Sequence, residues 1–123
     1  MVVADTDVII AALRGNDLAK RLLVKYMPEV YISAVTEMEL LVGATNTGKK
    51  EAVKQITSTH QILPLSKNIG QEAKRLLLLY NTTSRQLKMP DALIAATCIH
   101  HKCRLLTFNT KDYKFIKGLQ LVG

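Results

Sequence analysis

Apolar and polar residues follow two kinds of pattern along the chain, one typical of short buried strands and one typical of helices. Runs of four to six mainly apolar residues predict strands, because runs this short between helical segments suit a parallel sheet. Pro64, within the third run, removes a backbone donor and so favours an edge position for that strand. The runs span residues 2–5, 29–33, 61–65, 103–108 and 119–122.

The segments between these runs carry apolar residues at helical spacing, with polar residues on the opposite side. Gly15 and Asn16 end the first predicted helix, and Pro90 at a first-turn position indicates where the last one starts. Thr36 and Glu39 have the spacing of a capping box. Helices are therefore expected over residues 7–16, 17–27, 34–44, 51–60, 69–81 and 90–101.

The alternating elements predict an α/β fold of three layers, in which helices flank a mainly parallel sheet of roughly five strands. With 123 residues the chain suits one core, so we expect a single domain over residues 1–123. No apolar run approaches the roughly 18 residues that cross a membrane, and the N-terminus lacks a signal-peptide pattern. A cytoplasmic protein with reduced Cys98 and Cys103 is expected.

The chain is basic, with 17 Lys and Arg residues against 10 Asp and Glu and a formal net charge of +7. An excess of positive charge favours an anionic partner, of which nucleic acid is the commonest. The basic residues are scattered along the sequence, however, and they are not interleaved with aromatic residues as in RNA-stacking surfaces. Charge alone therefore leaves a generally basic surface with no specific partner as an open alternative.

Acidic residues are few, and they gather where predicted strands end. Because parallel sheets bind ligands outside the carboxyl ends of their strands, these acids are expected to converge. Such oxygen ligands suit a hard cation like Mg²⁺, which would also relieve the repulsion between neighbouring carboxylates. The acids are Asp5 and Asp7 after the first strand, Glu37 and Glu39 after the second, Asp91 at the start of the last helix, and Asp112 after the fourth strand.

Each acid also has a purely structural interpretation. Asp5 or Asp7 suits the N-cap of the first helix, and Asp91 suits a helix N-terminus through the macrodipole. Glu39 suits a capping box, and Asp112 suits a turn. Taken singly, the acids favour these interpretations. Taken together in a basic chain, they favour a cation site.

Four segments resemble the motifs of PIN domains, and they occur in that family's order over almost the whole chain. They are VVADTDVIIAAL, AVTEMELLVG, PDALIAA and LLTFNTKDY. Within the family the arrangement is most similar to VapC-like ribonuclease toxins of type II toxin-antitoxin systems. The resemblance implies a PIN-like fold and an endoribonuclease that depends on Mg²⁺, with Mn²⁺ as a substitute. It also implies RNA as the substrate, a cognate antitoxin as partner, and a homodimer.

The resemblance further implies roles for individual residues. Asp5 and Asp91 match the metal-binding carboxylates, and Glu39 and Asp112 complete the set of catalytic acids. The implied mechanism is in-line attack of a metal-activated water on an RNA phosphodiester, which needs no side-chain nucleophile.

Other matched positions have supporting or open roles. Thr107 and Asn109 resemble the polar residues that orient the acids. Asp7 falls where the family varies, so it is only a possible member of the site. Glu39 is preferred over Glu37 because it is followed by the leucine and glycine of the motif. Leu41 departs from relatives that carry arginine there, which leaves substrate or antitoxin contacts near this helix open.

Alternatives of other classes remain. A catalytically silent PIN-like module could bind RNA or a partner protein. A haloacid dehalogenase-like phosphatase would use Asp5 as a nucleophile, although the paired acidic motif of that family is missing. His100 and His101 lie near two cysteines, but without the spacing of a structural zinc site. His60 has no partner that the sequence identifies.

Overall fold

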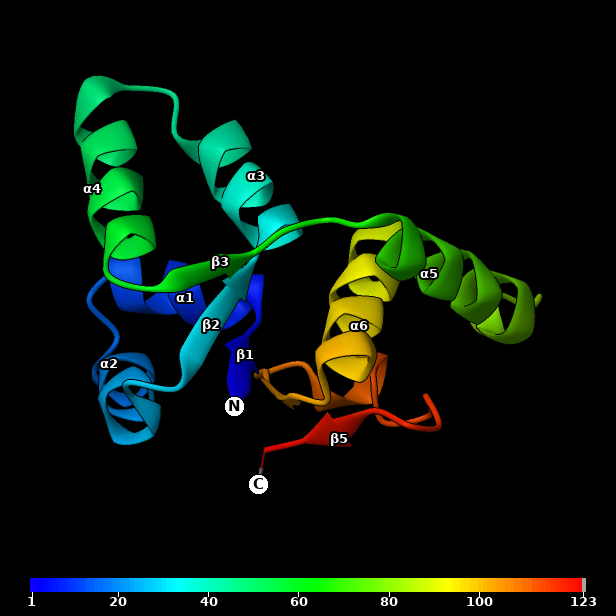
Figure 1. Ribbon diagram of the computed structural model, residues 1–123. Coiled ribbons are helices and arrows are strands. Elements are labelled where there is room, and N and C mark those ends of the chain that lie inside the picture. The colour runs from blue at the N-terminus through cyan, green and yellow to red at the C-terminus, as the bar shows by residue number, and fades with distance from the viewer. Residues whose placement is uncertain (123) are drawn as a thin grey trace.

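Five short strands form one sheet with the order β3-β2-β1-β4-β5 in the computed structural model, which describes residues 1–122 (Figure 1). All four neighbouring pairs are parallel, and helices cover both faces, so the predicted three-layer α/β fold is confirmed. Strand β3 lies at an edge, as Pro64 indicated. The strands are β1 (Val2–Ala4), β2 (Val30–Ser33), β3 (Gln61–Leu63), β4 (Arg104–Leu106) and β5 (Gln120–Leu121).

Helices lie on the two faces of the sheet because successive strand residues point in opposite directions. Val2 and Ala4 of β1 pack in one apolar cluster, and Val3 packs in the other. Helices α1, α2 and α4 cover the first cluster, and α5 and α6 cover the second (Figure 1). Helix α3 contributes to both. The helices are α1 (Thr6–Leu13), α2 (Asp17–Tyr26), α3 (Ala34–Gly43), α4 (Thr47–Ser58), α5 (Lys67–Tyr80) and α6 (Met89–His101).

The structure corrects the predicted cap of α3 and the predicted start of α4. Ser33 caps α3, because its Oγ accepts a hydrogen bond from the backbone N–H of Thr36 (3.1 Å). Thr36 therefore lies inside the helix, and the predicted capping box is wrong. Helix α4 begins at Thr47 rather than at residue 51, because Asn46 supplies its N-cap.

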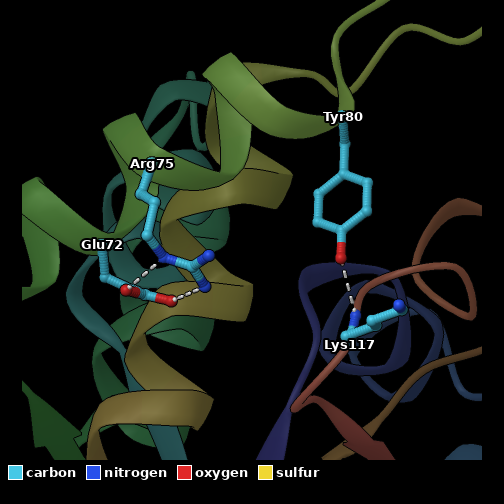
Figure 2. A network of polar contacts seen from close by, with 4 residues as sticks. All are labelled: Glu72, Arg75, Tyr80 and Lys117. Atoms are coloured by element: carbon cyan, nitrogen blue, oxygen red, sulfur yellow. Dashed lines mark hydrogen bonds and ion pairs between the residues drawn. The ribbon is translucent and has the colours of Figure 1, made fainter.

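The segment after β4 is tied to the end of α5. Figure 2 shows the hydroxyl of Tyr80 accepting a hydrogen bond from the backbone N–H of Lys117 (3.0 Å). The Tyr80 ring also meets Phe115 edge to face, with 5.4 Å between centroids, and the guanidinium of Arg85 lies 4.2 Å from the Phe115 centroid. These contacts fix the chain that follows the 3₁₀ turn η1 (Thr110–Asp112).

Two further expectations can be compared with the structure. Cys98 and Cys103 are buried free thiols, as predicted. Within residues 1–122, the helices are too short or too polar to cross a membrane.

Candidate active site

Asp5 stands at the end of β1, where it caps α1 and is only 6% exposed. Its Oδ1 accepts a hydrogen bond from the N–H of Thr6, and its Oδ2 accepts one from the hydroxyl of Thr107, both at 2.8 Å. Burial and the neighbouring charge of Asp7 nevertheless raise the pKa of Asp5 from 3.8 to about 6. The two hydrogen bonds only partly compensate the lost hydration of this carboxylate.

Asp7 lies in the first turn of α1 and faces the end of β4. Its Oδ2 accepts a hydrogen bond from the N–H of Phe108 (3.1 Å) and lies 3.4 Å from the Thr107 hydroxyl. Its Oδ1 is buried and has no hydrogen-bond partner among residues 1–122. Burial raises the pKa of Asp7, and repulsion from Asp112 adds to the rise. The free oxygen is thus a desolvated acceptor that a cation or a bound water could satisfy.

Asp91 lies in the first turn of α6 and accepts a hydrogen bond from the hydroxyl of Tyr113 (3.1 Å). Burial raises the pKa of Asp91, the Tyr113 hydrogen bond opposes the rise, and Asp112 and Glu39 add repulsion. Tyr113 is buried, and burial together with the charges of Asp5 and Asp91 raises its pKa. Tyr113 therefore stays neutral and available as a donor to Asp91.

Glu39 and Asp112 complete the acidic group from two other elements. Glu39 on α3 accepts a hydrogen bond from the Thr6 hydroxyl at 2.7 Å, which ties this helix to the start of α1. Asp112 is half-buried in η1, and its N–H donates to the carbonyl of Asn109 (3.0 Å). The repulsion that these two acids exert on Asp91 means that their charges act in the same region.

The two residues predicted to support the acids make different contacts. Thr107 is buried and its hydroxyl lies between Asp5 and Asp7, as expected for an orienting side chain. Asn109 is exposed, and it contacts this group through its backbone, with its N–H donating to Thr107 Oγ1 (3.0 Å).

Sequence reasoning missed the individual contributions of Thr6 and Tyr113. Thr6 hydrogen-bonds Glu39, and Tyr113 hydrogen-bonds Asp91. The available signals were weak, since Thr6 stands between two aspartates and Tyr113 directly follows Asp112. Sequence position alone does not distinguish an orienting hydroxyl from a solvated one.

The histidines lie apart from these contacts. The rings of His100 and His101 meet edge to face with 4.9 Å between centroids at the end of α6. His60 contacts the carbonyl of Ile56 through Nδ1 (2.9 Å), and its buried Nε2 has no partner among residues 1–122.

The chemistry of the carboxylates fits a divalent cation. Within residues 1–122 no group of three or more His, Cys, Asp or Glu side chains is arranged to hold a metal ion by protein ligands alone. Mg²⁺ does not require such a cage, because it is usually bound by one or two carboxylates, waters and substrate phosphate. The raised pKa of Asp5 and the free oxygen of Asp7 are what a site short of positive charge would exhibit.

A groove of about 270 Å³ opens beside Glu39, between α1, α3 and α4. Glu39 forms part of its wall. Ile10 and Leu40 contribute apolar surface, and Arg14 and Lys49 contribute positive charge. The groove therefore joins an apolar surface to the acidic group.

The sequence matches the PIN domain family over residues 2–117. The chain therefore belongs to the PIN-domain family. Within that family it is similar to the VapC proteins: it is 31% identical to ribonuclease VapC1 of Rickettsia felis over 130 residues, which cover 98% of this chain and 93% of that protein.

Solved structures agree with this assignment. A toxin-antitoxin complex from Klebsiella pneumoniae contains a chain that is 33% identical, with a TM-score of 0.83, and the match covers 97% of this chain and 95% of that one. VapBC2 from Rickettsia felis, bound to a fragment of its promoter DNA, has a TM-score of 0.89 at 21% identity. That match covers 99% and 98% of the two chains and supports the fold alone.

Proposed function

We propose that this protein is a metal-dependent endoribonuclease and the toxin of a toxin-antitoxin pair. The observation that carries the nuclease function is that, within residues 1–122, no lysine or arginine forms an ion pair with these acids, although the chain has a net charge of +7. The ion pairs found within residues 1–122 join Met1 to Glu29 and Arg75 to Glu72, away from the acidic group. A basic chain that leaves one buried and several half-buried acids without an ion pair is suited to binding an external cation.

In this proposal Asp5 and Asp91 hold Mg²⁺, with Mn²⁺ as a substitute, and Glu39 and Asp112 complete the catalytic acids. Asp7 is a possible further contact through its free Oδ1. When bound, the ion would lower the pKa of an attacking water and stabilise negative charge on the phosphodiester. Thr107 and Tyr113 would keep Asp5 and Asp91 oriented through the hydrogen bonds described above.

RNA as substrate agrees with the charges around the acidic group. Lys88 precedes the start of α6, and its charge opposes the rise that burial causes in the pKa of Asp91. Lys111 precedes Asp112 in η1, and both lysines are exposed. Cations at the rim would hold the phosphates of a polyanion while the acids remain free for the metal.

The antitoxin and a second copy of the chain are the proposed protein partners. The groove between α1, α3 and α4 is suited to an apolar segment that ends beside Glu39. Val42 on α3 and Leu78 on α5 are 82% and 78% exposed, which supports a homodimer that covers them. Light scattering of the purified chain should give the mass of a dimer, and the mass of a monomer at micromolar concentration would contradict this.

The nuclease function is tested by incubating structured and single-stranded RNA with the protein, with and without Mg²⁺ or Mn²⁺. We expect cleavage by the wild type that stops in EDTA and in Asp5→Asn and Asp91→Asn. Asp17→Asn is the matched control, because Asp17 is an exposed aspartate on α2. Cleavage that persists in EDTA or in both site variants would contradict the metal-carboxylate mechanism.

Two other outcomes would favour the alternatives. RNA binding without cleavage under all metal conditions would favour a catalytically silent module. A covalent phosphate on Asp5, trapped from a small phosphate ester, would favour the phosphatase, which the PIN-domain assignment does not support.

A further inference from the structure

Three hydroxyl groups connect the start of α3 to Glu39. The Ser33 hydroxyl donates to Thr36 Oγ1 (3.2 Å), Thr36 Oγ1 lies 2.9 Å from Thr6 Oγ1, and the Thr6 hydroxyl donates to Glu39 Oε1 (2.7 Å). Ser33 and Thr36 are fully buried, so solvent water does not reach them. The chain of hydroxyls joins α1 and α3, although Thr6 and Glu39 are 33 residues apart in sequence.

Counting protons fixes the direction of every bond in this chain. Each hydroxyl has a single hydrogen. Thr6 uses its hydrogen for the Glu39 carboxylate, so in the contact between the two threonines Thr36 must be the donor. Ser33 in turn donates to Thr36 and accepts from the Thr36 N–H (3.1 Å). All three hydroxyl dipoles therefore point toward Glu39, an arrangement in which each bond strengthens the next.

Helix formation does not explain why a threonine occupies position 36. Ser33 already caps α3, and Thr36 lies inside the helix, where threonine is a poor helix former. A buried hydroxyl also destabilises the fold unless it is hydrogen-bonded. The Thr36 hydroxyl accepts from Ser33 and donates to Thr6, and the bond to Thr6 is the one that links α3 to α1.

We propose that Thr36 is a positioning residue that holds the Glu39 carboxylate in its working orientation through Thr6, which rests on the nuclease function proposed above. Without the Thr36 hydroxyl, Thr6 loses the donor that orients it, and its hydroxyl can rotate away from Glu39. Glu39 is only half-buried and then becomes free to turn toward solvent. Thr36 contributes to the reaction rate by this route, without touching substrate or metal.

Two substitutions at position 36 separate positioning from packing. Thr36→Val keeps the shape and removes the hydroxyl, whereas Thr36→Ser keeps the hydroxyl and removes a buried methyl group. We expect Thr36→Val to lower kcat about 10-fold, the lower end of the effects found for residues that orient metal-site groups. KM for RNA should change less than about 2-fold, as for an interaction made mainly in the transition state. Thr36→Ser should retain most of kcat although it unfolds at lower urea concentration.

A merely structural role predicts that kcat follows stability, so that the variant with the larger loss of unfolding free energy is also the slower one. A second comparison places Thr36→Val in a Glu39→Gln background, with slow cleavage measured in single turnovers at enzyme excess. If Thr36 acts through Glu39, the valine substitution should then lower the cleavage rate less than about 2-fold. An equal loss in both backgrounds, or a wild-type kcat in Thr36→Val, would overturn the proposal.

A crystal structure of Thr36→Val gives a readout without activity. We expect the Glu39 carboxylate to leave Thr6 Oγ1, while Asp5 and Thr107 stay in place. An unmoved Glu39 would overturn the positioning role. Absence of RNA cleavage by the wild type would instead reject the nuclease function, and the position of Glu39 would still decide whether Thr36 holds it.

Discussion

Replacing Asp5 by asparagine should stabilise the metal-free protein at neutral pH, although it removes a proposed metal ligand. Asp5 is buried, and its pKa in the folded chain is about 6, compared with 3.8 ordinarily. Below pH 3.8 the group is protonated in both the folded and the unfolded state, so its ionisation does not affect stability. As the pH rises the unfolded chain loses this proton first, and stability falls until about pH 6. The full difference corresponds to about 3 kcal/mol of unfolding free energy.

Asparagine resembles the neutral carboxyl, so Asp5→Asn should recover most of this unfolding free energy. Its carbonyl oxygen can still accept from the Thr6 N–H, and its amide can donate to Thr107 Oγ1, so the loss in hydrogen bonding is small. With about 1 kcal/mol allowed for imperfect geometry, we expect Asp5→Asn to be about 2 kcal/mol more stable at pH 7.5. The gain should shrink toward zero as the pH falls to 4.

The measurement is urea unfolding in EDTA between pH 4 and pH 7.5. Asp17→Asn is the control, because this exposed aspartate favours the first turn of α2 and its loss should cost less than about 1 kcal/mol. Saturating Mg²⁺ should reverse the order, because the wild type then gains binding energy that the variant lacks. A wild type at least as stable as Asp5→Asn at pH 7.5 in EDTA, or a difference independent of pH, would refute the reasoning.

Three further outcomes are expected. Tyr113→Phe removes the hydrogen-bond donor that favours ionised Asp91, so the pKa of Asp91 should rise. The acidic limb of the pH–rate profile should then move to higher pH, and an unchanged limb would contradict the contact. Mn²⁺ should raise the Tm of the wild type and raise that of Asp91→Asn much less, which thermal scans would measure, and equal shifts would exclude Asp91 as a ligand. Cys98 and Cys103 are buried, and burial raises the pKa of both thiols, so a thiol reagent should label them only after unfolding; rapid labelling of the folded chain would contradict this.

The strands and helices could be predicted closely because the spacing of apolar residues and the residues at the element ends both match the observed elements. Apolar runs with few polar interruptions indicate strands buried on both faces, and residues such as Pro90 mark helix starts within one or two positions. Helix α4 is the exception, because Asn46 caps it and it starts at Thr47 rather than at residue 51. Helix α3 starts where it was predicted to, but its cap is Ser33 and not Thr36. A strand that ends in serine supplies a cap before the next candidate is reached.

The convergence of the acids could be inferred from the sequence, but their contacts could not. Ala4 pairs with Leu106 in the β1–β4 register, which brings the next residues, Asp5 and Thr107, side by side. A different register would have left the Thr107 hydroxyl away from Asp5. The strand register and the approach of α3 to α1 belong to the tertiary structure. The hydrogen bonds of Thr107 and Thr6 depend on them, so they could not be predicted from local sequence.

Two helix N-termini point at the acidic group, yet they do not neutralise it. Asp5 caps α1, and Asp91 lies in the first turn of α6, where the macrodipole favours a negative charge by about 0.3–1 kcal/mol. Burial and the charge of Asp7 together oppose the ionisation of Asp5 by more than this, which is why its pKa remains raised. The helices thus hold the carboxylates in position but leave a deficit of positive charge. A lysine or arginine in direct contact with the acids would remove that deficit and weaken the binding of a cation. Among residues 1–122 no such contact is formed. The acidic group therefore lowers the stability of the metal-free fold and favours metal binding.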